Sequence, residues 1–247
     1  MVDYELGWDK WGDMVKYSPA PYHRRRLIMK TLEPLEFSNI LDVGCGNGIL
    51  IELLRKRFPL ARIVGVDFSE KVISENQSKY TDCEFYHLDI SSKVLEDKFD
   101  LVICSEVIEH IEDYLAALRN LRKMAQNIVI VTVPAGRIFP IDKIVGHYRH
   151  FTKKTLSDAL KASEILPQRI KKWGFPFHTL YKYVINIRPQ ETMSRFGEQD
   201  YSASSYLISQ FLRALFFLNS ENFVVGNQLI AIGRVIDEKE CFTSYLA

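Results

Sequence analysis

The stretch LDVGCGNGIL, from Leu41 to Leu50, is the part of the sequence that most strongly indicates the fold. It begins as an apolar run that carries one acid, Asp42, and continues with glycines at alternate positions, Gly44, Gly46 and Gly48. Glycines between a strand and a helix let a ligand approach the backbone, and the first N–H groups of a helix have no partner within it. The stretch therefore predicts a strand, turn and helix that hold a cofactor, and the alternative is a tight turn without a ligand.

The spacing of the glycines argues against a dinucleotide. The dinucleotide fingerprint is G-x-G-x-x-G, whose last glycine allows close packing of helix on strand. This chain has G-x-G-x-G, and Ile49 stands where that last glycine would be.

Short apolar runs alternate with amphipathic stretches beyond this point, and such alternation is typical of βαβ units on a parallel sheet. We expect a sheet with helices on both faces. The expected strands are 40–45, 62–67, 83–89, 99–105 and 127–134, and the expected helices are 49–57, 70–80 and 114–124.

Further elements flank this core. We expect a helix over 21–32, a helix capped by Thr152, and strands near 169–175 and over 227–235. The segment between the last two strands is too long for a simple connection, and it contains two helical patterns, 179–187 and 204–218. We interpret 176–222 as a helical insertion that shapes a pocket or an interface.

The composition restricts the class of protein. The chain has 247 residues and is 47% hydrophobic, and 32 Lys+Arg balance 31 Asp+Glu, so we expect no nucleic-acid partner. The basic cluster 23–26 is interpreted as a solvated helix face. We expect a cytoplasmic protein without stable membrane insertion, because no apolar segment is long enough to cross a membrane and the cysteines occur singly. These are Cys45, Cys83, Cys104 and Cys241.

Acids at the ends of the next two strands identify the ligand. Asp67 ends the second strand, where a carboxylate can accept hydrogen bonds from ribose hydroxyls. Phe68 can lie against an adenine ring, and Asp89 and Ile90 at the third strand can contact the adenine amino group and ring. The three strand ends together predict an adenosine site.

With these motifs in order, the sequence resembles the class I S-adenosylmethionine-dependent methyltransferases, over residues 38–175 with a return at 223–235. LDVGCGNG matches the first family motif at every position. The small-molecule branch, of the ubiquinone-biosynthesis and sugar-pathway types, is most similar. The resemblance implies a Rossmann-like sheet of seven mostly parallel strands in the order 3-2-1-4-5-7-6, with the last strand antiparallel. It implies S-adenosylmethionine as cofactor, with its methionine end held by Asp42 and the backbone of Gly44, Cys45, Gly46 and Gly48.

The segment FDLVICSEVIEHIED, residues 99–113, resembles the part of the family that passes under the cofactor, which implies that Ser105 and Glu106 lie near the methionine moiety. Glu106, Glu109 and His110 would share one face if the segment were helical. Such a face could bind a divalent cation, as some relatives with Glu-x-x-Glu-His do, and the extra imidazole would come from 147 or 150. We favour the alternative that Glu106 and His110 orient cofactor and loop by hydrogen bonds, and we assign no metal site.

The stretch GHYRHFT, residues 146–152, resembles a Gly-His-x-Arg-x-aromatic-Ser/Thr segment of small-molecule and sugar-pathway members. His147 and Arg149 could project into the acceptor pocket. Because an alcohol acceptor must lose a proton, we expect His147 to be the base, with His110 as the second candidate. Arg149 would bind an anionic acceptor or pair with a carboxylate. The alternative for each histidine is a loop residue satisfied by the backbone.

We expect one methyltransferase domain over 1–247: a helical cap at 1–37, a cofactor-binding core at 38–175, the acceptor-side insertion at 176–222, a final strand at 223–235 and a tail at 236–247. The expected activity is methyl transfer to an oxygen, or less favourably a nitrogen, of a small-molecule or saccharide-type acceptor. The rival functions are an NAD-type oxidoreductase and a non-catalytic protein that binds the cofactor. A homodimer stays open. Six aromatic residues of the insertion would line the acceptor pocket, namely Phe177, Tyr181, Tyr183, Phe196, Tyr201 and Tyr206.

Overall fold

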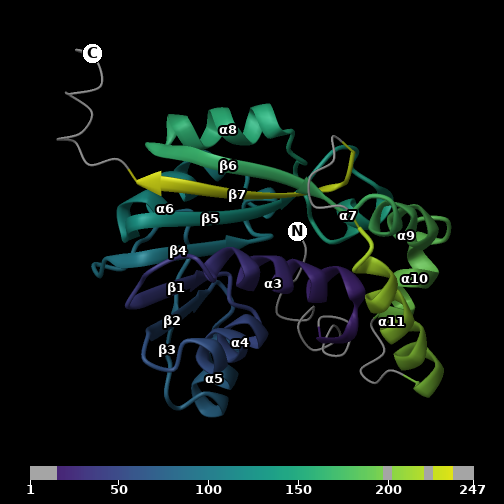
Figure 1. Ribbon diagram of the computed structural model, residues 1–247, viewed down its shortest axis with the longest axis horizontal. Coiled ribbons are helices and arrows are strands. Elements are labelled where there is room, and N and C mark those ends of the chain that lie inside the picture. Colours follow the sequence, from purple (N-terminus) through teal and green to yellow (C-terminus); the bar gives the residue numbers. More distant parts are fainter. Residues whose placement is uncertain (1–15, 197–201, 220–224, 236–247) are drawn as a thin grey trace.

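The computed structural model of the protein describes residues 16–196, 202–219 and 225–235 and contains a seven-stranded sheet in the order β3-β2-β1-β4-β5-β7-β6 (Figure 1). Strands β1 to β5 run parallel to one another, whereas β7 runs antiparallel to both β5 and β6. This confirms the expected fold class and strand order. The strands are β1 (Asn39–Val43), β2 (Arg62–Asp67), β3 (Glu84–His87), β4 (Phe99–Ser105), β5 (Ala125–Pro134), β6 (Ile165–Trp173) and β7 (Gln228–Val235).

Helices cover both faces of the sheet, because side chains alternate along each strand. On β1, Leu41 and Val43 belong to a buried cluster with α6 (Tyr114–Met124) and α8 (Lys153–Ala162). Ile40 belongs to the opposite cluster, with α3 (Pro19–Leu32), α4 (Ile49–Arg57) and α5 (Glu70–Lys79). The two clusters fix the sheet between its helical layers.

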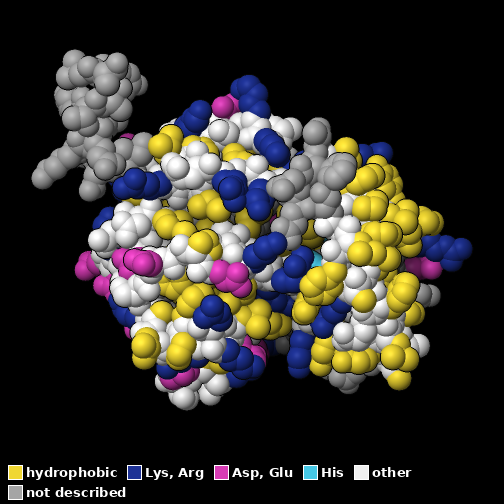
Figure 2. Space-filling view, viewed as in Figure 1, with side chains coloured by type: hydrophobic (Ala, Val, Ile, Leu, Met, Phe, Trp, Pro, Cys, Tyr) yellow, Lys and Arg dark blue, Asp and Glu magenta, His cyan; other side chains and the backbone are white. Residues whose placement is uncertain are grey.

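The helices α9 (Phe177–Ile185), α10 (Pro189–Phe196) and α11 (Ala203–Phe216) stand at the edge where the parallel strands end (Figure 1). We call these three helices the insertion lobe. Helix α3 joins the lobe to the core, because His23 Nε2 lies 2.8 Å from the main-chain oxygen of Arg213 in α11. Hydrophobic side chains cover much of the lobe surface in Figure 2. Leu180 in α9 and Phe211 in α11 are among its exposed hydrophobic residues.

The expected helices 49–57 and 114–124 have the predicted bounds, and Thr152 caps α8 as predicted by accepting the N–H of Thr155. Two short helices were not predicted, α7 (Pro140–Ile144) and α10. Strand β6 begins four residues before the expected start at 169, because it is an edge strand whose polar side chains hide the pattern. Tyr201, Cys241 and the tail 236–247 lie outside the described residues, as does the side chain of Phe196.

The condition under which Glu106, Glu109 and His110 would share one helical face is not met. Only a three-residue 3₁₀ turn, η1 (Ile108–His110), is present, and Glu106 precedes it with a φ of 57°. Glu106 therefore projects separately from Glu109 and His110. The interpretation of 23–26 as a solvated face is wrong, because His23 is only 1% exposed and Arg24 forms an ion pair.

The close packing of Gly65 in β2 against Phe85 can be tested by mutation. A Cβ at this position would lie 2.8 Å from the Phe85 ring and 3.1 Å from Cys45 Sγ. Gly65→Ala should lower the free energy of unfolding by about 1–3 kcal/mol, because overpacking forces the ring to move. Chemical denaturation of Gly65→Ala, Phe85→Leu and the double variant checks this. We expect the double variant to lose less than the sum of the single losses, and strict additivity would contradict the close contact.

Candidate active site

The glycine turn adopts a shape that side chains oppose. Gly44, Gly46 and Gly48 have φ values of 71°, 50° and 74°, in the left-handed region that favours glycine. A Cβ at Gly44 would lie 2.3 Å from Val107 Cγ2, and one at Gly48 would lie 2.5 Å from the Tyr80 ring. The turn at the start of α4 therefore requires glycine at these positions, both for its backbone conformation and for the close packing around it.

Asp67 ties this turn to the end of β2. One carboxylate oxygen, Oδ2, accepts the N–H of Gly46 at 2.9 Å, and the other accepts the N–H of Ser69 at 3.0 Å. Asn76 in α5 supports the same turn, because its Nδ2 donates to the carbonyl of Gly46 at 2.6 Å. Only Asp67 of these supports was predicted, since Asn76 lies on a helix with no motif around it.

Asp42 is buried in the sheet beneath the turn, with 2% of its surface exposed. Burial raises its pKa to about 8, and the nearby charge of Asp67 adds to the effect. The two buried carboxyls on neighbouring strands create a site that favours a positively charged or hydroxyl-rich ligand. They fit the methionine and ribose parts of S-adenosylmethionine.

The predicted adenine contacts follow at the ends of β2 and β3. Phe68 is 62% exposed, so its ring is available to a ligand. Asp89 accepts hydrogen bonds from the N–H and hydroxyl of Ser91, and these fix the loop after β3. Ile90 is buried, and its carbonyl accepts Nδ2 of Asn120 at 2.9 Å.

The end of β4 presents Ser105 and Glu106. Ser105 Oγ lies 2.9 Å from the hydroxyl of Thr132 on β5, and that hydroxyl lies 3.2 Å from Oε1 of Glu106. Arg24 of α3 pairs with Oε2 of Glu106 at 3.4 Å, and Gln228 of β7 lies at the same distance from Oε2. The positive φ of Glu106 is uncommon outside glycine, and such strain often marks functional positions. No motif of the sequence indicated Arg24 or Gln228, because both lie far along the chain from the segment that contains Ser105 and Glu106.

The segment after β4 meets the segment after β5. Ligand atoms of Glu109, His110 and His147 all lie within 4.8 Å of one another, and so do those of Asp142, His147 and His150. The rings of His110 and His147 are 4.5 Å apart between centroids, and His147 Nδ1 lies 3.0 Å from His150 Nε2. The structure therefore brings together His110, His147 and His150, which were candidates from the sequence, and adds Asp142, which was not.

Glu109 is fully buried, and in the described part of the chain neither of its carboxylate oxygens has a hydrogen-bond partner. Burial raises its pKa well above the usual range, and the charge of Glu106 contributes further. A buried carboxyl without partners is costly. Such a group fits a cation, since Glu109 faces two imidazoles that can also be ligands.

His110 and His147 are neutral near pH 7. Burial lowers the pKa of His110 to about 4 and that of His147 to about 2, where the neighbouring His110 and His150 contribute as well. A neutral imidazole can be a metal ligand, but one with so low a pKa is a weak base.

Arg149 binds the backbone of the loop after η1. Its Nη1 and Nη2 donate to the carbonyls of Ile111 and Glu112, at 2.7 and 2.9 Å, and its guanidinium lies 4.4 Å from the centre of the Tyr114 ring. It therefore anchors this loop, and its role toward an anionic acceptor stays a prediction.

The raised pKa of Asp42 predicts a pH-dependent stability. The carboxyl ionises near 3.8 in the unfolded chain and at about 8 in the folded one, so between these values only the folded state keeps the proton. Stability contributed by the protonated group is therefore lost as the pH rises through this interval. Thermal unfolding without ligand should show a smaller loss with pH for Asp42→Asn than for the wild type. Parallel pH profiles would contradict the assignment.

Three comparisons with known proteins agree with this geometry. A family model described as a methyltransferase domain matches residues 20–184, which is more than half of the chain. Trans-aconitate 2-methyltransferase of Escherichia coli O139:H28 (strain E24377A) is 32% identical over 137 residues, covering 51% of this chain and 54% of the relative. The chain thus spans about half the length of the curated relatives it matches.

Two solved structures share the fold. The N-methyltransferase NodS of Bradyrhizobium japonicum has a TM-score of 0.59 and 17% identity, with 95% of this chain and 96% of that chain covered. A putative sarcosine dimethylglycine methyltransferase of Galdieria sulphuraria has a TM-score of 0.60 and 12% identity, with 87% and 86% covered. No helix in the described parts of the chain has the length and hydropathy that a membrane crossing requires. The family match and the glycine turn with its two buried acids lead to the same conclusion: the chain belongs to the methyltransferase domain family and has the class I fold that its motifs predict.

Proposed function

We propose that the protein transfers the methyl group of S-adenosylmethionine to an oxygen, or less favourably a nitrogen, of a small-molecule or saccharide-type acceptor. The observation that carries this proposal is the pair of buried acids, Asp42 and Asp67, beside a turn of three glycines in the left-handed conformation. The trans-aconitate 2-methyltransferases among the relatives support a small-molecule acceptor.

The residues that would hold the cofactor follow from this arrangement. Asp42 and the turn from Gly44 to Gly48 would bind its methionine end, which brings positive charge to a buried carboxyl. Asp67 would accept the ribose hydroxyls, and the residues after β3 would contact adenine. When bound, S-adenosylmethionine supplies a methyl group activated by a sulfonium. The chain's own contribution is to orient that group, with Ser105 and Glu106 beside the methionine part.

Transfer to a hydroxyl would break the sulfur–carbon bond, form a carbon–oxygen bond and release the hydroxyl proton to solvent water. In-line displacement depends on alignment, so positioning contributes much of the rate. We propose that Glu109, His110 and His147 would hold a divalent cation, and such a cation would make an acceptor hydroxyl more acidic. Two imidazole nitrogens with one carboxylate suit Zn²⁺, Fe²⁺ or Mn²⁺.

The rival role of His147 as the base is less well supported, because burial lowers its pKa to about 2. The hydrogen-bonding role expected for His110 leaves the buried Glu109 carboxyl unexplained. A cation between them would account for both the neutral imidazoles and the acid without partners.

We assign the insertion 176–222 to the acceptor side of a single domain. A groove of about 640 Å³ lies between α3 and the insertion lobe, and Phe177 and Tyr181 line it. Tyr183 and Tyr206 make other contacts, with Phe139 and Tyr17 respectively. The aromatic residues therefore divide between the groove and the packing of the lobe.

Two rival functions give different results in one experiment. An NAD-type oxidoreductase would bind NAD at the same turn, and a non-catalytic protein would bind the cofactor without transferring its methyl group. The glycine spacing, with Ile49 at the third dinucleotide position, favours the methyl donor.

Asp67→Ala should abolish binding of S-adenosylhomocysteine in a calorimetric titration, because the ribose hydroxyls lose a charged acceptor. Asp67→Asn, which keeps the size of the side chain, should also bind far more weakly. Asp158→Ala on exposed α8 is the matched control and should bind as the wild type does. Binding of NAD in place of S-adenosylhomocysteine by the wild type would sink the proposal.

Glu109→Gln should abolish high-affinity Mn²⁺ binding, because the amide removes the only carboxylate of the ligand set without changing its size. The loss of the free Mn²⁺ signal in electron paramagnetic resonance titrations measures this, and added Zn²⁺ should compete. Glu112→Gln, an exposed neighbour, is the control. Equal Mn²⁺ affinity in wild type and Glu109→Gln would exclude this site.

A further inference from the structure

We propose that Lys182 and Asp142 are positioning residues for the imidazoles on the acceptor side, so that helix α9 of the insertion lobe orients His147. This inference rests on the proposed function, since it concerns the same site. It assigns a role to two charged residues that no motif in the sequence identifies.

Asp142 in α7 is the centre of the arrangement. Its Oδ1 receives Lys182 Nζ at 2.8 Å, while its Oδ2 accepts the N–H of Phe139 at 2.8 Å and lies 3.4 Å from His150 Nε2. Its main-chain carbonyl accepts the N–H of His147 at 2.9 Å. Asp142 therefore contacts the start of α7, the imidazole of His150 and the backbone of His147.

The contacts continue from Asp142 to the proposed ligands. His150 Nε2 lies 3.0 Å from Nδ1 of His147, and the rings of His147 and His110 pack edge to face. A contact at Nδ1 determines which nitrogen of His147 carries the proton and how the ring is turned. Residues that orient a ligand histidine in this way affect metal affinity although they do not touch the metal.

These groups are enclosed by protein. The side chains of Lys182, Asp142 and His150 are 10%, 5% and 1% exposed. Lysine is seldom buried unless it is paired, and a buried carboxylate needs a compensating charge. Lys182 therefore supplies from α9 the opposite charge that the buried Asp142 carboxylate needs.

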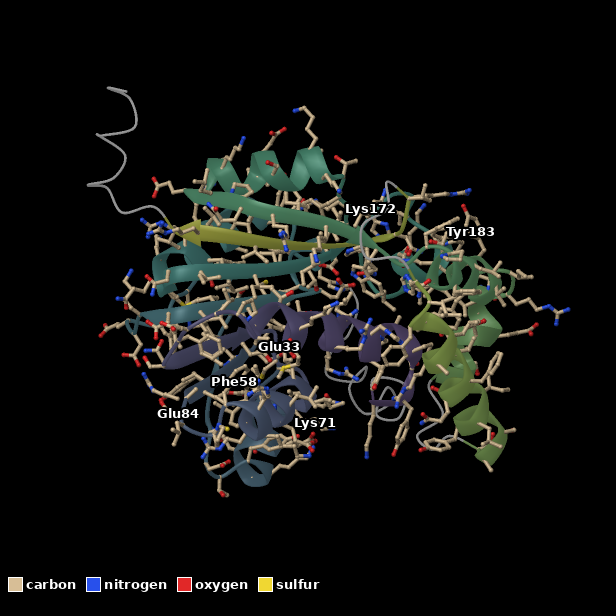
Figure 3. The ribbon with its side chains drawn as sticks, viewed as in Figure 1. Glu33, Phe58, Lys71, Glu84, Lys172 and Tyr183 are labelled. Atoms are coloured by element: carbon tan, nitrogen blue, oxygen red, sulfur yellow. The ribbon has the colours of Figure 1, made fainter. Side chains whose placement is uncertain are left out.

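Helix α9 is held against α7 by two further contacts. Tyr183, labelled in Figure 3, packs edge to face on Phe139 with ring centroids 5.1 Å apart. Asn186 Oδ1, at the end of α9, accepts the N–H of Ile141 at 3.0 Å. Helix α9 is therefore fixed at three points next to the loop that carries His147.

Lys182→Met tests the role in the full-length protein. It should weaken Mn²⁺ binding by about 10–100-fold and shift the ¹H–¹⁵N imidazole signals of His147 and His150. Affinity for S-adenosylhomocysteine should stay unchanged, because Asp42 and Asp67 are untouched. Lys182→Arg should recover most of the Mn²⁺ affinity, and Lys154→Met, which removes an exposed ion-paired lysine, should change neither measurement.

The double variant Lys182→Met/Asp142→Asn removes both charges, so it avoids a buried unpaired charge and keeps the test informative if Lys182→Met alone unfolds. The same losses are expected in it. Unchanged imidazole signals and Mn²⁺ affinity in a folded variant, with only a lower melting temperature, would overturn the inference. Failure of the wild type to bind Mn²⁺ would reject the cation site, and the imidazole signals would then still decide whether Lys182 and Asp142 position His147.

Discussion

The hydrogen bond from the N–H of Gly46 to the carboxylate of Asp67 is the constraint on which the site depends. It joins the turn after β1 to the end of β2, and the left-handed glycines let the backbone reach the carboxylate. It also keeps an acid buried close to Asp42, whose pKa rises in consequence of burial and of that neighbour. The protein thus holds Asp42 in an environment that disfavours its charge, and a cationic ligand relieves this cost.

The acceptor side shows a second use of charge. Elements outside the βαβ core each contribute one cation to a carboxylate at the site: α3 brings Arg24 to Glu106, and α9 brings Lys182 to Asp142. These two elements are linked through α11, which His23 of α3 contacts. The N-terminal helix and the insertion lobe therefore contribute to the site itself as well as to the packing around it.

The core could be predicted from the sequence because its signals are local. Alternating apolar runs gave β2 and β4 with the observed bounds, and the glycine turn with Asp67 located the cofactor side. Neither Arg24 nor Lys182 could be found in this way, because each acts through a contact with a residue distant in the chain. Arg24 was interpreted as solvated, since a basic cluster on a helix gives no indication of what packs against it.

The acceptor motifs were predicted in part. Gly-His-x-Arg-x-aromatic located His147 and His150 correctly beside His110, although no periodic pattern joins these segments. Glu106, Glu109 and His110 would share a face only in a helix, and the structure has no helix there, because Glu106 has a positive φ and a 3₁₀ turn follows it. Arg149 was placed in the right loop, but two backbone carbonyls bind its guanidinium.

The central claim is that this chain moves a methyl group to a small acceptor. Incubating the protein with methyl-labelled S-adenosylmethionine and fractionated cell extract, and then following the label, tests it most directly. We expect label in a small-molecule fraction, bound through oxygen, and we expect Asp67→Ala to abolish it. Label that stays on the cofactor in every fraction, or that appears only on nucleic acid, would contradict methyl transfer to a small molecule.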